Sequence, residues 1–378
     1  MNNPNFNTMR TLNLIGFLTL AFCSNLVAQD FLRQKPNRCS DCQGQTKLLL
    51  EGASFIKNNE YFGPYTEGFT GLGFFLKPQV QFHLSDRTRL DAGWFVLQYY
   101  GQEGFNPSLP IFRLQHQLKP GIELILGSLY GSTQHGLEEP LFRIDRYYQN
   151  QMEYGAQLLI EKKRFTADLW VNWEQFIEPG DSFQEHLEAG LVADFILYDR
   201  NYRLDIPIQG YVRHKGGQID ASPLAVSTIF NGMWGLRWTS SWEENRSLSI
   251  SSLYFGFTSD LPAQGANALP ISQGKGWMFR TQLNWEGWQA MMGYWRGNNF
   301  MAPKGEYLFS SLSDFNPNYS DQIRRVLMAK VIWSNTSLDA IDWGWRTDAY
   351  WDRDAGEFNY ALAVFMQFQL EKLWELGR

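Results

Sequence analysis

The sequence predicts an all-β fold, a single antiparallel β-barrel of about 16 strands. The first reason is alternation, which residues 73–97 (GFFLKPQVQFHLSDRTRLDAGWFVL) show clearly. Apolar side chains from Phe74 to Leu84 occupy the even positions, and the odd positions are mostly polar. Such period-two runs indicate strands, and two of them across a short polar turn indicate a hairpin. The second and third reasons are the number of such runs and the regular alternation in the length of their connections.

Residues 1–28 are predicted to be a secretory signal peptide. Arg10 supplies a positive charge, a mostly apolar stretch runs from Leu12 to Phe22, and Ala28 offers a small residue for cleavage. The apolar stretch is short for a retained membrane anchor, which is the alternative. Cys23 follows a loose lipobox, but Phe22 stands where that motif has a small residue. We therefore expect the chain to be exported.

Residues 29–45 form a polar, periplasmic N-terminal extension that contains Cys39 and Cys42. In an oxidising compartment, two cysteines at this spacing favour a local structural disulfide. A redox-active pair or half of a zinc site is the alternative, but no second CxxC or histidine pair accompanies them. We expect a disulfide between Cys39 and Cys42 and no metal site.

Sixteen alternating runs follow and define the predicted barrel, residues 46–370. The last run is the most regular, with apolar side chains at every even position from Phe358 to Leu370. Residues 371–378 are predicted to be a C-terminal tail. The predicted strands are 46–56, 69–84, 88–99, 109–118, 121–130, 152–161, 164–176, 186–197, 203–213, 229–240, 247–257, 276–286, 288–296, 322–333, 342–352 and 358–370. Pro78 and Pro207 fall inside runs, and each predicts either a bulge or a strand that ends earlier.

The connections between these runs alternate in length. Short polar connections such as 85–87 and 162–163 alternate with long ones such as 131–151 and 297–321, although 353–357 is short where a long one is expected. A meander barrel shows this alternation when one rim faces the periplasm and the other faces the outside. An even number of strands then places both termini on the periplasmic side.

The apolar face could contact either a protein core or lipid. A soluble sandwich or propeller also has alternating strands. The runs are about 10 residues or longer, however, which suits tilted membrane-spanning strands, and no propeller repeat of about 40 residues appears. Tryptophans of the apolar parity, such as Trp94, Trp173, Trp277 and Trp351, lie near strand ends, as in aromatic girdles. We therefore expect the apolar face to contact lipid.

The chain resembles Gram-negative outer-membrane β-barrels of the porin type. The resemblance covers about residues 46–370 and consists of the signal peptide, the sixteen runs, the alternating connections and the aromatic-rich last strand. It implies an outer-membrane location, assembly by the barrel-assembly machinery, and a homo-oligomer as one option. Such barrels usually end on an aromatic residue, whereas this chain continues from Glu371 to Arg378.

The polar parity of such a barrel is expected to face an aqueous lumen. Residues of both signs would then create a field that favours polar solutes, or they would pair across strands and only fill the wall. The candidates for lining the lumen are Arg89, Asp91, Arg113, Asp168, Glu174, Arg213, Arg280 and Arg346.

The third long connection, 131–151, is the strongest candidate for a functional segment. In porins this connection commonly folds into the barrel and narrows it, and its Leu141-Phe142 and Tyr147-Tyr148 pairs suit burial. A lid over the outer rim is the alternative. The second candidate is the stretch 297–321, which is rich in aromatic residues. The predicted constriction residues are His135, Glu138, Glu139, Arg143, Asp145 and Arg146.

The function expected from these features is passage of small hydrophilic solutes across the outer membrane through a charged, loop-constricted lumen, without a cofactor. The alternative is a non-conducting barrel that acts as a docking or assembly component of a surface or secretion complex. A barrel-borne hydrolase would need a nucleophile beside a histidine at the rim, and only weak candidates occur among the five histidines. We therefore expect no enzymatic activity. The net charge of −6 argues against nucleic-acid binding.

Overall fold

A computed structural model describes residues 42–243, 245–262, 268–316, 318–338 and 341–375 of the chain. The predicted signal peptide, Cys39 and the last three residues lie outside this range, and the predicted disulfide therefore stays a prediction. No helix in the described part of the chain is long and apolar enough to cross a membrane.

Sixteen antiparallel strands form one closed barrel, in which each strand pairs with its neighbours in sequence and β1 pairs with β16. This confirms the predicted fold. The strands are β1 (Gln45–Glu60), β2 (Thr70–Ser85), β3 (Thr88–Tyr99), β4 (Ser108–Lys119), β5 (Ile122–Ser128), β6 (Tyr154–Lys162), β7 (Phe165–Gln175), β8 (His186–Asp199), β9 (Arg203–Lys215), β10 (Ser227–Glu243), β11 (Arg246–Ser259), β12 (Gln273–Trp285), β13 (Trp288–Asn298), β14 (Ile323–Leu338), β15 (Ile341–Asp352) and β16 (Glu357–Glu375).

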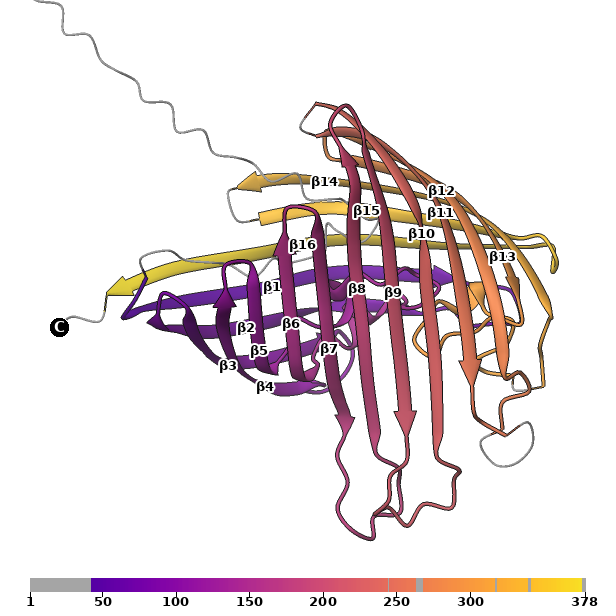
Figure 1. Cartoon of the computed structure of the whole chain (residues 1–378), viewed down its shortest axis with the longest axis horizontal. Helices are drawn as coiled ribbons and strands as arrows, with labels where there is room; N and C mark the ends of the chain where they lie inside the picture. The colour runs from indigo at the N-terminus through magenta and orange to yellow at the C-terminus, as the bar shows by residue number, and fades with distance from the viewer. Residues whose placement is uncertain (1–41, 244, 263–267, 317, 339–340, 376–378) are drawn as a thin grey trace, which may run out of the picture.

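The strands are strongly tilted, as closure of a barrel requires. In Figure 1 the strands β7–β10 cross the far strands β14–β16 and β1 at a large angle. The short connections lie at one rim, and the connections β7–β8 and β9–β10 extend well beyond their strands at the other. We call these the short rim and the long rim.

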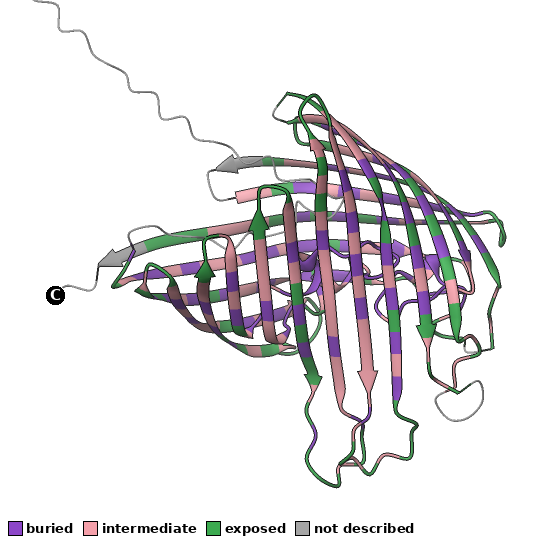
Figure 2. Cartoon of the chain, viewed as in Figure 1, coloured by how far each residue is buried: buried purple, intermediate pink, exposed green. Residues whose placement is uncertain are grey.

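Buried and exposed residues alternate along many of the strands (Figure 2), because successive side chains of a strand point to opposite faces of the wall. On β2, Lys77, Gln79, Gln81 and His83 are buried and face the lumen, whereas Leu72, Phe82 and Leu84 are exposed on the outside. An inward polar face and an outward apolar face are the reverse of a soluble protein and are the pattern of an outer-membrane barrel.

Most of the exposed tryptophans on the outer face form two groups. Trp173, Trp277 and Trp351 lie toward the long rim, and Trp242, Trp285, Trp288 and Trp343 lie near the short rim, whereas Trp94 and Trp234 are nearer the middle of their strands. These positions match aromatic girdles at the two membrane interfaces, with apolar side chains between them.

The two prolines interrupt the strand pairing on one side only. The register between β2 and β3 is the same before and after Pro78, and the register between β9 and β10 is the same on both sides of Pro207. Each proline still has a partner on its other side, Leu50 and Asp194 respectively. Both strands therefore continue through the proline, without a bulge or an early end at that position.

The barrel extends further at its C-terminal end than the predicted residue 370. Strand β16 continues to Glu375, where it pairs with Gln45 at the start of β1. Most of the predicted tail is therefore part of the closing strand. This extension was not predictable from alternation, because the pattern weakens after Leu370.

Candidate functional site

Two long connections fold back into the lumen. The β5–β6 connection, residues 129–153, contains η2 (Ser132–His135) and α1 (Arg146–Gln149), and the β13–β14 connection, residues 299–322, contains η3 (Tyr307–Phe309). Leu141 and Phe309 are fully buried, and most of their neighbours on these connections are buried as well. We call the described residues of both connections the plug (129–153, 299–316 and 318–322).

The two parts of the plug are joined by main-chain hydrogen bonds. The Arg143 amide donates to the Lys304 carbonyl at 2.8 Å, and the Glu306 amide donates to the Glu139 carbonyl at 2.9 Å. Phe142 and Lys304 form an isolated β-bridge between the same segments. The two connections therefore act as one structural unit inside the barrel.

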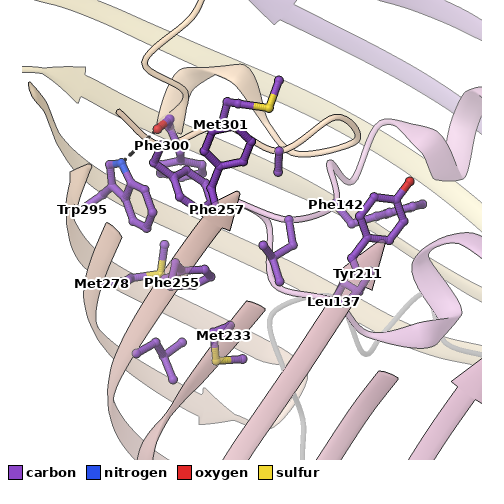
Figure 3. Close-up of a cluster of buried hydrophobic side chains, with 14 of the residues drawn as sticks. Leu137, Phe142, Tyr211, Met233, Phe255, Phe257, Met278, Trp295, Phe300 and Met301 are labelled. Atoms are coloured by element: carbon purple, nitrogen blue, oxygen red, sulfur yellow. Dashed lines mark hydrogen bonds between the residues drawn. The ribbon is translucent and has the colours of Figure 1, made fainter. Parts of the chain in front are cut away.

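An apolar cluster packs the plug against the wall formed by β9–β14 (Figure 3). The indole Nε1 of Trp295 donates a hydrogen bond to the Phe309 carbonyl at 3.1 Å. The cluster has the character of a protein core, although it lies inside a barrel. Its labelled members in the plug are Leu137, Phe142, Phe300 and Met301, and those on the wall are Tyr211, Met233, Phe255, Phe257, Met278 and Trp295.

A second apolar cluster packs the plug against the opposite wall. Tyr147 and Tyr148 of α1 pack on Phe55 of β1 and Phe75 of β2, with ring centroids 4.8 Å apart for Tyr148 and Phe55. Close packing of this kind leaves no room for water. The part of the lumen toward the long rim is therefore filled at both walls.

Charged contacts hold the plug to the wall. The guanidinium of Arg280 donates to both carboxylate oxygens of Glu138, at 2.6 and 2.9 Å. Glu139 accepts from the Lys330 ammonium and from the Tyr350 hydroxyl, the latter at 2.7 Å. These carboxylates are buried, so their partners are needed to offset the cost of desolvation.

His135 of η2 lies between two carboxylates. Its Nδ1 lies 2.7 Å from Asp168 on β7, its Nε2 lies 2.9 Å from Glu153, and its ring stacks on Trp170 at 3.6 Å. Burial lowers the pKa of His135, but Asp168 and Glu153 raise it more strongly, to about 9. Burial raises the pKa of Glu153, but the contact with His135 lowers it more strongly, to about 2. The site is therefore an imidazolium held by two carboxylates.

The remaining predicted constriction residues are also on the plug. Asp145 accepts from the Asn59 amide and lies 3.5 Å from the Lys57 ammonium. Arg146 lies 3.8 Å from Glu174, and Arg143 is partly buried. All six predicted residues thus belong to the inserted segment.

The predicted lumen residues all lie on the inward parity of their strands, and most of them form pairs. Arg89 and Arg113 both contact the buried Asp91, at 2.7 and 3.2 Å. Asp168 and Arg280 contact the plug as described above. Glu174 accepts from Lys304 at 3.0 Å, Arg346 contacts Asp348 at 2.8 Å, and Arg213 is paired in the ladder with Glu188.

A polar gap remains beside the plug along the first four strands. Its lining includes Glu51, Lys77, Gln79 and Arg113 on the wall and Tyr130 on the plug. Among the described residues, no partner contacts the buried side-chain acceptors of Gln79 and Gln81 on β2. Unpaired buried acceptors of this kind favour hydration.

Several residues of the site were not predicted from the sequence. Lys304 donates to Glu174 and to Glu188, and Glu188 also accepts from the Tyr211 hydroxyl at 2.6 Å. The ring of His135 stacks on Trp170, and Glu139 accepts a hydrogen bond from the Tyr350 hydroxyl. Inward parity could have identified Trp170, Glu188 and Tyr350, but no local signal places Lys304 against two strands more than 100 residues earlier.

The described residues contain no group of three or more histidine, cysteine, aspartate or glutamate side chains that could hold a metal ion.

Solved structures with a similar fold include two proteins of Pseudomonas aeruginosa, the outer membrane protein OprD and OpdL. OprD is 11% identical, with a TM-score of 0.53, over 88% of this chain and 96% of OprD. OpdL is 13% identical, with a TM-score of 0.50, over 86% of this chain and 99% of OpdL. These similarities show the shared barrel fold.

At the level of sequence, no curated protein matches the chain. A family model does match, over residues 35–375, which include the whole barrel and both parts of the plug. The chain belongs to the lipid A 3'-O-deacylase-type family.

Proposed function

We propose that the protein is a gated outer-membrane channel for small hydrophilic solutes, and that the plug is its gate. The observation that carries the proposal is a two-part plug held inside a charged lumen by ion pairs such as Glu138–Arg280. A plug that only filled the lumen would need no more than apolar packing. Buried charge pairs cost desolvation free energy, and they separate more readily when water enters. The ion pairs between the plug and the wall therefore favour a plug that moves over one that is fixed.

The polar gap along β1–β4 supports the same proposal. It lies between the plug and the wall, and charged and amide side chains line it. A small shift of the plug away from this wall would widen the gap into a polar path along β1–β4. The solutes that such a path favours are polar and small, because side chains of both signs line it.

The test is conductance of the full chain in a planar bilayer. We expect rare or small steps from the native protein, and larger, frequent steps when a short Gly-Ser linker replaces residues 132–151. The matched control replaces 217–225, a connection outside the lumen, and should leave the conductance unchanged. Heat-dependent electrophoretic mobility would verify that each variant is folded.

The ion selectivity of the channel provides a second test, which uses the Glu138–Arg280 ion pair. Glu138→Gln removes the counter-charge of Arg280, and we expect it to shift the permeability ratio toward anions. If native and shortened variants are both folded and silent, the channel proposal fails. The filled lumen would then favour the second candidate, a docking component of a surface complex.

We also propose that the protein carries out no covalent chemistry. The support is the state of His135, whose ring nitrogens each contact a carboxylate while its ring stacks on Trp170. A general base needs a free nitrogen directed at a nucleophile or water. Because the family is named for deacylation of lipid A, the direct test is mass spectrometry of lipid A after incubation with the protein. We expect intact acyl chains, and release of a 3'-O-linked chain would contradict the proposal.

A further inference from the structure

Three arginines lie side by side on the outer face of the barrel. Arg296 on β13 is directly opposite Arg325 on β14 in the strand register. The Arg353 amide, just after β15, donates to the Arg325 carbonyl at 2.9 Å and continues the same row. All three side chains are exposed. We call Arg296, Arg325 and Arg353 the arginine row.

The row carries more positive charge than its neighbours neutralise. Arg325 donates to Asp354 at 2.5 and 2.8 Å. Among the described residues, Arg296 and Arg353 make no ion pair, and the exposed Lys275 on β12 adds a fourth cation beside them. Like charges directly opposite each other destabilise a sheet. An anion that bridges the row would remove this cost.

The row lies at the expected boundary between membrane and water. Arg296 and Arg325 are each two residues from the ends of their strands at the long rim, or about 7 Å along the strand. Trp277 is paired with Arg296 in the strand register. Trp351 is paired with Leu327, which lies two residues beyond Arg325 on β14, toward the middle of the barrel. Aromatic side chains at this level mark the interface of a membrane barrel.

The positive charge is local to this wall. Toward the long rim, outward positions of other strands hold apolar side chains such as Leu72 on β2, Trp173 on β7 and Phe230 on β10. A general requirement for solubility at the rim would distribute charge around the barrel. The concentration of positive charge on β12–β14 and just after β15 instead indicates recognition of a particular anion.

We propose that the arginine row and Lys275 bind the phosphate of a lipid headgroup in the leaflet at the long rim. Guanidinium groups bind phosphate oxygens in a bidentate manner, and a row of three can hold one or two phosphates. In outer-membrane barrels the long connections face the outside, so this leaflet is the outer one.

The surface below the row indicates a lipid and not a soluble phosphate. Phe279, Met292 and Leu327 are exposed outward on the same strands, and Met292 is 70% exposed. They form an apolar strip that runs from the row toward the middle of the membrane. One molecule with a phosphate and acyl chains would contact both the row and the strip.

The experiment measures lipid binding to the full chain by native mass spectrometry in detergent micelles. The probes are a bisphosphorylated lipid A and the same lipid after enzymatic removal of its phosphates. The triple variant Arg296→Gln, Arg325→Gln and Arg353→Gln should raise the Kd for the phosphorylated lipid about tenfold or more. It should not change the Kd for the dephosphorylated lipid, and the corresponding triple lysine variant should recover part of the affinity.

The matched control is Arg246→Gln near the short rim. Arg246 is partly buried, contacts Glu243 and Glu286, and lies over Trp285, so it is an interfacial arginine on the other side of the membrane. Its substitution should leave both Kd values unchanged.

Three outcomes would overturn the proposal. These are an unchanged Kd in the triple glutamine variant, an equal loss of affinity for both lipids, and displacement of the lipid by millimolar inorganic phosphate. Because the row lies outside the lumen, a failure here would leave the conductance measurements unaffected.

Discussion

At the scale of single residues, His135 connects residues of the plug and of the wall through three contacts. It combines two carboxylate contacts and an indole stack, and its side chain is fully buried. The contacts to Asp168 and Trp170 tie η2 to strand β7. Loss of the imidazolium would leave buried negative charge at the junction between plug and wall.

We predict that His135→Gln loosens the β5–β6 part of the plug by about 1–3 kcal/mol, because a neutral amide replaces a cation between two carboxylates. Trypsin cleavage after Arg143 and Arg146 should then become about fivefold faster or more. His214→Gln is the control, since His214 lies in strand β9, outside the plug, and contacts Thr228. Equal cleavage rates in native and His135→Gln proteins would contradict the assigned role.

The strands and the insertion of the plug were predictable from the sequence, but the contacts of the plug were not. Alternation predicted all sixteen strands and the inward parity of residues such as Arg280, because period two is a local property. Insertion of residues 131–151 was predicted from the porin resemblance, in which the third long connection commonly enters the barrel, and from the Leu141-Phe142 and Tyr147-Tyr148 pairs. The partners of this segment were not predictable, because Glu138 and Arg280 are 142 positions apart and are joined only by barrel closure.

At the scale of elements, two tryptophans lie over glycines of the adjacent strand. A Cβ at Gly190 on β8 would come within 2.1 Å of Trp170, and a Cβ at Gly276 on β12 would come within 2.0 Å of Trp295. Each glycine therefore lets an indole lie flat on the inner wall. The indoles in turn support the two parts of the plug, through His135 and Phe309.

We predict that Gly276→Ala lowers the free energy of unfolding by about 1–3 kcal/mol, because it overpacks Trp295 within its ring of aromatic contacts. Gly256→Ala on β11 is the control, since no atom lies within 4 Å of its added Cβ. Urea unfolding followed by tryptophan fluorescence would measure both. If the two variants were equally stable, the close fit of Trp295 over Gly276 would have no energetic role.

At the scale of the whole molecule, the plug contains two groups, His135 and Glu306, whose raised pKa values both make the closed plug less stable as the pH rises. The pKa of His135 is raised to about 9, and burial, with Asp145 and Glu139 nearby, raises the pKa of Glu306 to about 8. Lys304 lowers the pKa of Glu153, the partner of His135, and Arg143 partly offsets the rise in the pKa of Glu306. A group whose pKa is higher in the folded protein contributes stability that is present below its ordinary pKa and is lost as the pH rises through the raised value.

The closed plug should therefore weaken as the pH rises from about 7 to 10. Over this range Glu306 becomes charged beside two carboxylates and His135 loses the charge that pairs Asp168 with Glu153. We predict that the conductance of the native protein in a planar bilayer increases across this interval, with a midpoint between pH 8 and 9, and returns when the pH is lowered. His135→Gln should conduct more at pH 7 and show a smaller increase, because one of the two groups is absent. A conductance that is flat from pH 7 to 10, in a protein that stays folded, would mean that these two groups do not hold the plug closed.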